Sequence, residues 1–194
     1  MTVIRVNPES VHAYGRTAQE KFNTIHTELV ALVNGVVAVR YFGPNSVAFK
    51  TQCGEIAADC ANKLSADLGA IADAIKASTS NIAASLGGAP VIIAVEGATI
   101  SPPSPVVVNY VDVDTAALAD EVPVVQGHFT AIKTALADHL STLVATDWEG
   151  NAKIQAVDLV SGFTGKAQAS VDETQTSLVN YINDQVHSVV AADR

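Results

Sequence analysis

The sequence predicts an all-α fold in which two helical hairpins pack antiparallel into a four-helix bundle and are joined by a long, extended linker rich in Pro and Val. Three observations support this prediction. Hydrophobic residues make up 48% of the 194 residues, charged residues 16% and aromatic residues only 5%, which favours closely packed helices over a sheet built on large side chains. Apolar residues recur at steps of three and four, the period of a helix. The second half of the chain also repeats the first.

The repeat defines the organisation of the chain. When the sequence is shifted by 107 residues without a gap, identical and conservative matches run through both halves. A register of this length is hard to obtain from composition alone, and it indicates two hairpin units, residues 2–87 and 109–194, around a linker at 88–108. The identical pairs include Val6 and Val113, Phe22 and Phe129, Ile25 and Ile132, Thr27 and Thr134, Leu29 and Leu136, Gly43 and Gly150, and Ile75 and Ile182.

The first unit is expected to contain two helices. Asn7-Pro8-Glu9 is an N-cap followed by Pro at the first helical position, and a second apolar series starts after Gly43 and stops at Gly87-Gly88. Asn34-Gly35 is a C-terminal signal for the first helix, but its counterpart Thr142 carries none, which leaves that boundary open. The apolar positions are Val11, Tyr14, Ala18, Phe22, Ile25, Leu29 and Leu32, then Phe49, Cys53, Ile56, Cys60, Leu64, Leu68, Ile71, Ile75, Ile82 and Leu86.

The second unit repeats this pattern. Asp114-Thr115 is expected to cap its first helix, and Pro123 to start or kink that helix. The apolar stripe of its second helix is weaker around Gly162 and Gly165. The apolar positions are Leu118, Val122, Val125, Phe129, Ile132, Leu136, Leu140 and Leu143, then Ile154, Val157, Val171, Leu178, Ile182, Val186 and Val189.

The linker contains four prolines and two Val-rich stretches, Val91–Val95 and Val106–Val108, and a short hairpin is conceivable around Glu96-Gly97. Its length indicates how the hairpins pack. A helix over 44–86 is roughly 60 Å long, and about 23 extended residues reach up to roughly 75 Å. Because parallel hairpins need only a short connection, this linker favours the antiparallel arrangement.

The two turns are Tyr41-Phe42-Gly43 and Trp148-Glu149-Gly150, which occupy equivalent positions of the repeat. Glycine permits positive φ and a tight reversal, and the aromatic ring fills the open end of the hairpin. A helix, an aromatic-x-Gly turn and a longer helix resemble the WXG family of small type VII secretion substrates. Trp148-Glu149-Gly150 matches the motif literally, and Tyr41 replaces its Trp. The simpler interpretation is that Tyr41, Gly43, Trp148 and Gly150 only close hairpins; the functional one adds a surface that an export machine recognises.

The resemblance implies a fused pair that acts through protein–protein contacts with the type VII secretion ATPase or an effector. The family's export signal is Tyr-x-x-x-Asp/Glu after the second helix of one partner. Tyr181 has Gln185 four residues on and fails this pattern, whereas Tyr110 and Asp114 satisfy it within the segment that leads to the second unit. The alternative interpretation is a strand end at Tyr110 and an N-cap at Asp114.

Composition limits the partners. A net charge of −9 argues against nucleic acid and against anionic membranes. The N-terminus is polar by residue 5 and breaks at Pro8, so we expect no Sec signal peptide, and the longest apolar run, Val91–Val95, is too short for a membrane span. We expect synthesis in the cytoplasm and, from the resemblance, export to the outside or the cell surface.

No motif indicates an enzyme, a cofactor, a small-molecule substrate or a metal site. Cys53 and Cys60 lie seven residues apart in the apolar stripe, too far to bridge, and are expected to be core residues. The five histidines show no ligand spacing, and His139 is expected to be a packed or rim residue. Two alternatives to the secretion role remain, an intracellular helical scaffold or dimerisation module and a membrane-active bundle, which the mean hydropathy of +0.27 permits.

Overall fold

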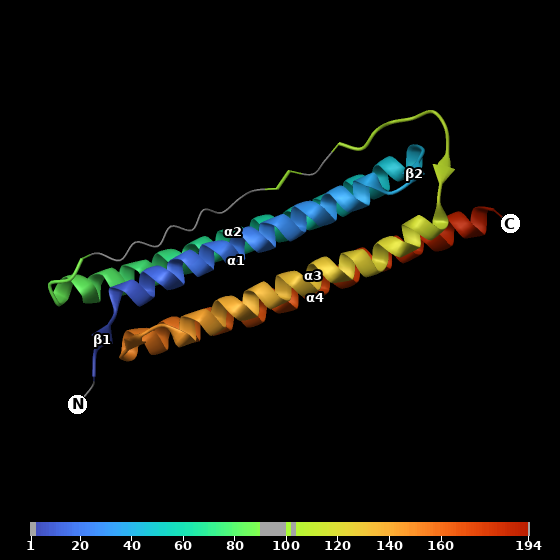
Figure 1. The fold of residues 1–194 in the computed structure, drawn as a ribbon. Coiled ribbons are helices and arrows are strands. Elements are labelled where there is room, and N and C mark those ends of the chain that lie inside the picture. Colours follow the sequence, from blue (N-terminus) through green and yellow to red (C-terminus); the bar gives the residue numbers. More distant parts are fainter. Residues whose placement is uncertain (1–2, 90–99, 102–103, 194) are drawn as a thin grey trace. The chain divides into compact units, whose positions relative to one another are not determined.

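The computed structural model describes residues 3–89, 100–101 and 104–193. The chain is an all-α four-helix bundle made of two hairpins, as predicted, with four two-residue strands beside the helices. Figure 1 shows α1 and α2 as the first hairpin and α3 and α4 as the second. In chain order the elements are β1 (Arg5–Val6), α1 (Pro8–Ala38), β2 (Tyr41–Phe42), α2 (Pro44–Ser85), β3 (Asp112–Val113), α3 (Thr115–Ala145), β4 (Trp148–Glu149) and α4 (Asn151–Ala192).

The predicted repeat holds element by element. Helices α1 and α3 both have 31 residues, and α2 and α4 both have 42. Every element of the second half begins 107 residues after its counterpart in the first, from β1 and β3 to α2 and α4. We call β1 to α2 hairpin 1 and β3 to α4 hairpin 2, and residues 107 apart are called equivalent.

The strands link the two hairpins. Strand β1 pairs antiparallel with β4, and β2 pairs antiparallel with β3. Because β4 and β2 are the turns while β1 and β3 precede the first helix of each hairpin, each turn pairs with the leading strand of the other hairpin. We use "leading strand" for β1 and β3. This reciprocal pairing is the antiparallel arrangement that the linker length predicts.

The chain divides into two compact units, and each contains a segment of all four helices. Unit 1 comprises 1–25, 63–98 and 133–168, and unit 2 comprises 26–62, 99–132 and 169–194. The predicted apolar stripe supplies most of both cores. Buried stripe residues of unit 1 include Val11, Phe22, Leu64, Leu68, Ile75, Leu136 and Leu143, and those of unit 2 include Leu29, Leu32, Phe49, Cys53, Leu118, Phe129, Ile132, Val171, Leu178 and Ile182.

Two residues of the predicted stripe are exposed. Leu86 is exposed because α2 ends at Ser85 and the chain then turns through Gly87, which has a φ of 75°. The N–H of Gly88 donates to the carbonyl of Ala83, the bond that closes a Schellman C-cap, so the predicted helix stop is confirmed. Ile154, in the first turn of α4, is also exposed.

Both predicted N-caps are present. The Oδ1 of Asn7 accepts the N–H groups of Glu9 and Ser10, and the Oδ1 of Asp114 accepts those of Ala116 and Ala117. These side chains satisfy amide groups that no helical carbonyl can reach. The caps explain why α1 begins at Pro8 and α3 at Thr115.

Two local signals do not set a helix boundary. Gly35 does not stop α1, which continues to Ala38, and the missing Cβ leaves room for Glu121, whose Oε1 would lie 2.8 Å from a Cβ at this position. Pro123 does not start α3, because the cap at Asp114 begins the helix eight residues earlier and Pro123 lies inside it. Packing and capping therefore outweigh the local preferences.

The linker is described only in part. The suggested hairpin around Glu96-Gly97, like the stretch Val91–Val95, lies outside the described residues. Ile100 is buried in unit 2, and its N–H donates to Oδ1 of Asn62 on α2 at 3.2 Å. This contact attaches the linker to the side of α2.

Candidate functional site

The first turn closes hairpin 1 through a glycine at positive φ. Gly43 has a φ of 130°, a conformation that residues with a Cβ rarely adopt. The N–H of Tyr41 donates to the carbonyl of Val39 at 2.7 Å, and Ser46 donates from its N–H and its hydroxyl to the carbonyl of Gly43. The ring of Tyr41 is buried beneath the turn.

The second turn closes hairpin 2 in the same way. Gly150 has a φ of 118°, the N–H of Trp148 donates to the carbonyl of Thr146 at 2.8 Å, and the N–H of Lys153 donates to the carbonyl of Gly150 at 3.1 Å. Trp148 is only 1% exposed, and its buried Nε1 has no hydrogen-bond partner among the described residues. Both motif aromatics, Trp148 and Tyr41, therefore lie in the core, and any surface at the turns consists of their neighbours.

Each turn glycine also lies against the leading segment of the other hairpin. A Cβ on Gly43 would lie 3.2 Å from Cγ2 of Val111, and one on Gly150 would lie 3.4 Å from the carbonyl oxygen of Val3. The glycines thus serve the reversal of the chain and the close approach of a second segment. All four predicted motif residues take part in contacts between hairpins.

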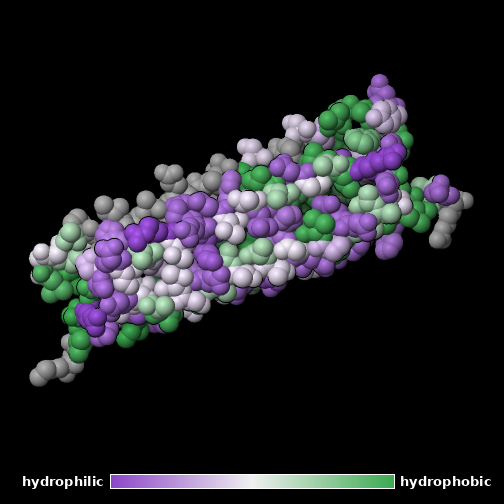
Figure 2. Space-filling view, in the orientation of Figure 1, coloured by the Kyte–Doolittle hydropathy of each residue, from purple (hydrophilic) through white to green (hydrophobic). Residues whose placement is uncertain are grey.

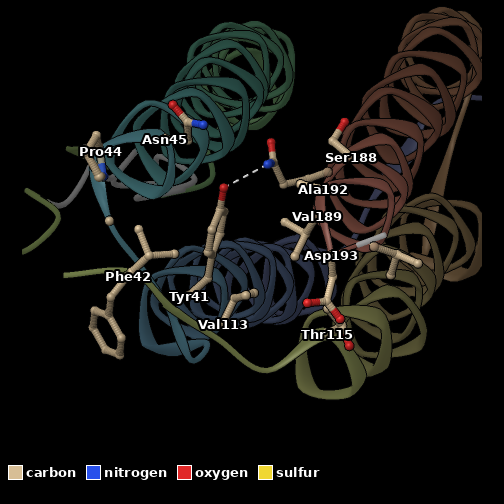
Figure 3. Close-up of a pocket in the computed structure, with 14 residues that line it drawn as sticks. Tyr41, Phe42, Pro44, Asn45, Val113, Thr115, Ser188, Val189, Ala192 and Asp193 are labelled. Atoms are coloured by element: carbon tan, nitrogen blue, oxygen red, sulfur yellow. Dashed lines mark hydrogen bonds between the residues drawn. The ribbon is translucent and has the colours of Figure 1, made fainter.

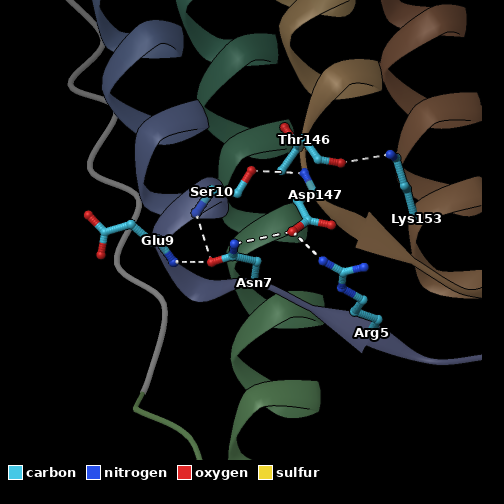
Figure 4. A network of polar contacts seen from close by, with 7 residues as sticks. All are labelled: Arg5, Asn7, Glu9, Ser10, Thr146, Asp147 and Lys153. Atoms are coloured by element: carbon cyan, nitrogen blue, oxygen red, sulfur yellow. Dashed lines mark hydrogen bonds and ion pairs between the residues drawn. The ribbon is translucent and has the colours of Figure 1, made fainter.

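The junction of β1 with β4 belongs to unit 1 and is shown in Figure 4. The backbone N–H of Asn7 donates to the carbonyl of Asp147 at 3.0 Å, and the N–H of Asp147 donates to Oγ of Ser10 at 2.8 Å. The carboxylate of Asp147 accepts from Arg5 at 2.9 Å and from the amide of Asn7 at 3.2 Å. Asp147 therefore ties the second turn to the cap of α1.

The junction of β2 with β3 belongs to unit 2 and has the same backbone pattern with the charges exchanged. The N–H of Asp114 donates to the carbonyl of Arg40 at 2.9 Å. The guanidinium of Arg40 donates to both carboxylate oxygens of Asp112, each at 3.1 Å, and this carboxylate raises the pKa of Arg40. Arg40 is equivalent to Asp147, and Asp112 is equivalent to Arg5.

Two lysines bind the end of the helix that precedes each turn. The ammonium of Lys50 donates to the carbonyls of Val37 and Val39 at 2.8 and 2.9 Å. The ammonium of Lys153 donates to Val144 and Thr146 at 2.9 and 2.8 Å, which are the equivalent carbonyls. Neither α1 nor α3 has a basic residue in its last turn, so these lysines supply the missing cation from the next helix. Burial lowers the pKa of Lys50.

Aromatic side chains from both hairpins meet in unit 2. Phe49 lies 5.8 Å from the ring of Tyr41 and 5.3 Å from that of Tyr181 on α4. The amide of Gln185 donates to the hydroxyl of Tyr41 at 2.8 Å. Burial raises the pKa of Tyr41, and Tyr181 adds to this effect. We call Tyr41, Phe49, Tyr181 and Gln185 the turn cluster.

A pocket of about 730 Å³ opens beside the turn cluster (Figure 3). The first turn, β3 and the last turns of α4 line it, with an apolar side formed by Tyr41, Phe42 and Val189 and polar groups that include Ser188 and Asp193. The hydroxyl of Tyr41, which is labelled in Figure 3, accepts a hydrogen bond from the amide of Gln185. The pocket is a concave surface next to a predicted interaction motif.

The predicted export signal lies beside the first turn. Tyr110 is 57% exposed, and its ring lies 6.3 Å from that of Phe42. Asp114 caps α3, which agrees with the simpler interpretation of that residue. Exposed apolar residues gather here, and Figure 2 shows hydrophobic residues around β2 and β3, whereas the helix faces in this view are mostly polar. The exposed apolar residues of this region are Val106, Val107, Tyr110 and Val111.

Sequence reasoning missed the groups that join the hairpins. His139 is packed as expected, but nothing in the spacing indicated that its Nε2 lies 2.7 Å from the hydroxyl of Tyr14. The exchanged ion pairs were visible as opposite charges at equivalent positions, Arg5 against Asp112 and Arg40 against Asp147, once the repeat was aligned.

Within the described residues, no group of three or more His, Cys, Asp and Glu side chains is arranged to hold a metal ion. Cys53 and Cys60 are both buried, and burial raises the pKa of Cys53 to about 12. No helix in this part of the chain has the length and apolar character that a membrane crossing requires.

No protein-family model, curated protein or solved structure matches this chain.

Proposed function

We propose that this protein is a non-enzymatic substrate or export partner of a type VII secretion system, a fused pair of WXG-like hairpins that acts through protein–protein contacts. One observation carries the proposal. Two aromatic-x-Gly turns occupy equivalent positions, both have glycine at positive φ, and each bears the leading strand of the other hairpin. This reciprocal use of both turns supports a fused pair of WXG-like hairpins.

The fusion itself has a physical advantage. A linker between two binding modules makes their association intramolecular, so that the second module binds without a further encounter in solution. In the reciprocal pairing of β1 with β4 and of β2 with β3, each hairpin contributes both its turn and its leading strand to the contact. The protein would therefore leave the cytoplasm as a preformed pair, toward the outside or the cell surface.

The recognised surface would be the region around the first turn. Tyr41 is buried, so a secretion ATPase or an effector would contact its neighbours Phe42, Tyr110 and Val111. The pocket beside the turn cluster, which Asp193 helps to line, would also be available. An apolar patch with a polar rim is typical of a protein interaction site. Tyr110 is the residue of this patch that also fits the export pattern.

The test is secretion from a native host with and without a working type VII ATPase, with a cytosolic marker as the control for lysis. We expect ATPase-dependent appearance in the culture filtrate. Tyr110→Ala should reduce export several-fold, while the matched variant Leu159→Ala, also exposed but on α4 in unit 1, should not. Retention of the wild type, while another substrate is exported, would contradict the proposal and favour an intracellular scaffold.

A further inference from the structure

The two junctions carry the same ion pair with opposite polarity. In unit 1 the leading strand supplies the cation and the turn the anion, Arg5 with Asp147; in unit 2 the leading strand supplies the anion and the turn the cation, Asp112 with Arg40. We infer that these pairs determine pairing specificity: each hairpin presents a surface that fits the other hairpin of this chain and rejects a second copy of itself. This inference does not depend on the export role.

The charges can be followed through the alternative pairings. If hairpin 1 paired with a second hairpin 1 in the same geometry, Arg5 would face Arg40 at both ends. If hairpin 2 paired with a second hairpin 2, Asp112 would face Asp147 at both ends. Only the mixed pair places opposite charges at both junctions. Like charges placed directly opposite each other disfavour a wrong partner even where the correct pair adds little affinity.

Exposure explains why the pairs act on choice of partner more than on stability. The side chains are 61% and 36% exposed for Arg5 and Asp147, and 63% and 35% for Arg40 and Asp112. Water screens such pairs, so each stabilises the fold only slightly. A wrong pairing replaces two attractive junctions by two repulsive ones. The difference in pairing free energy between the right and the wrong partner therefore includes contributions from both junctions, and this difference sets specificity.

The turn cluster gives a second, independent reason. Hairpin 1 contributes Tyr41 and Phe49, and hairpin 2 contributes Tyr181 and Gln185. At the positions equivalent to these last two residues, hairpin 1 has Ala74 and Ser78. Two copies of hairpin 1 would therefore lose the contact between the rings of Phe49 and Tyr181 and the hydrogen bond to the hydroxyl of Tyr41.

A third reason lies on the facing sides of α1 and α3. The hydroxyl of the buried Tyr14 is bonded to His139, whose equivalent in hairpin 1 is Leu32, so a pair of hairpins 1 would leave that hydroxyl without a partner. Glu121, equivalent to Tyr14, takes space that Gly35 leaves open, and the equivalent of Gly35 in hairpin 2 is Thr142. Two copies of hairpin 2 would force Glu121 to move.

The test exchanges charges in the full chain without changing its composition. Arg40→Asp with Asp147→Arg makes both native junctions like-charged and makes like-with-like pairing attractive. Arg5→Asp with Asp112→Arg does the same from the leading strands. The four changes together restore opposite charges at both native junctions. Lys63→Asp with Asp73→Lys, on an exposed face of α2, is the matched control.

Two differently tagged copies of each variant are unfolded together and refolded at low salt over a series of protein concentrations, because pairing between chains competes with the intramolecular pairing of the linked hairpins. One tag is captured and the other is quantified, because a like-with-like pair needs two chains. We expect both double exchanges to raise mixed-tag complexes several-fold over the wild type. The fourfold variant and the control should stay at the wild-type amount. In about 1 M salt the increase should disappear, since the screening length there is about 3 Å.

Unchanged capture by both double exchanges would overturn the inference, as would a fourfold variant that still captures like the doubles. Circular dichroism decides the remaining outcomes. Double exchanges that do not fold, beside a fourfold variant that does, would support the inference, because the fourfold variant contains every substitution of both. A fourfold variant that does not fold would overturn it.

Discussion

The hydroxyl of Tyr14 and the Nε2 of His139 lie 2.7 Å apart and join α1 to α3 in the core of unit 1. The rings stack at 5.6 Å, and Phe22 lies 5.2 Å from the imidazole. The Nδ1 of His139 is buried without a partner, and burial lowers the pKa of this histidine to about 4. Desolvation also raises the pKa of Tyr14. The imidazole is therefore neutral at physiological pH.

This burial predicts loss of stability in acid. The folded-state pKa of His139, about 4, lies below its ordinary value of 6.5, so the unfolded chain binds the extra proton between these values. The contribution of neutral His139 to the free energy of unfolding is complete above pH 6.5. It falls by about 3 kcal/mol as the pH drops toward 4, since each pKa unit corresponds to about 1.4 kcal/mol. Urea unfolding measured from pH 7.5 to 4 should show the decrease.

Carboxylates titrate in the same range, so the comparison needs a matched variant. His139→Leu combined with Tyr14→Phe places at position 139 the residue that its equivalent Leu32 already has and leaves no orphaned hydroxyl. The double variant should lose much less stability between pH 6.5 and 4 than the wild type. Parallel curves for the two proteins would show that His139 does not titrate as described.

Substitution of the buried Lys50 should be costly even when methionine, a side chain of similar length, replaces it. Lys50→Met leaves the carbonyls of Val37 and Val39 without their donor in a buried position, which we expect to cost about 3 kcal/mol. Lys153→Met removes the equivalent bonds at a more exposed place and should cost about 1 kcal/mol. Urea midpoints compare the two, and equal losses would contradict the role given to burial.

The turn glycines should not tolerate a side chain. Gly43→Ala and Gly150→Ala place an alanine at φ values of 130° and 118°, with its Cβ directed toward Val111 and Val3. Each variant should therefore lose about 1–3 kcal/mol of unfolding free energy. Gly69→Ala is the control, because a Cβ there meets nothing within 4 Å and alanine favours the helix, with an expected gain of up to about 1 kcal/mol. Thermal unfolding gives all three values.

Trp148 should matter first for stability. Trp148→Ala empties a fully buried position in unit 1 and should cost about 3–5 kcal/mol, whereas Glu149→Ala beside it, on an exposed side chain, should be nearly neutral. Circular dichroism during denaturation measures both. Export of Trp148→Ala is therefore informative only beside its melting curve, because a loss of folding also stops export.

The helices and turns could be predicted because periodicity and caps are local. The spacing of apolar residues predicted four helices, and Asn7 and Asp114 cap two of them as expected. The end of α1, which the sequence left open, lies beyond Gly35, and Pro123 lies inside α3, because a backbone preference of one residue is smaller than the packing of a whole helix. The aligned repeat supplied the equivalence of the two turns, Gly43 and Gly150.

The partners across hairpins could not be predicted. Helical spacing places Tyr14 and His139 on apolar faces but does not say which residue of one helix faces which of another, since that depends on helix stagger. The same holds for Gln185, which lies 144 residues from Tyr41 along the chain. The candidate site was thus located from sequence, while its hydrogen bonds required coordinates.

The lysines that close α1 and α3 show how the two halves have diverged. They bind equivalent carbonyls, but Lys50 stands opposite Val157 in the repeat and Lys153 stands opposite Ser46, one helical turn away. An alignment of the two halves therefore shows a mismatch at each lysine, although the two lysines make equivalent hydrogen bonds. The two halves keep the same acceptor carbonyls, while the lysine that donates to them stands at a different position of the helix. The halves are therefore more alike in their hydrogen bonds than an alignment of their residues indicates.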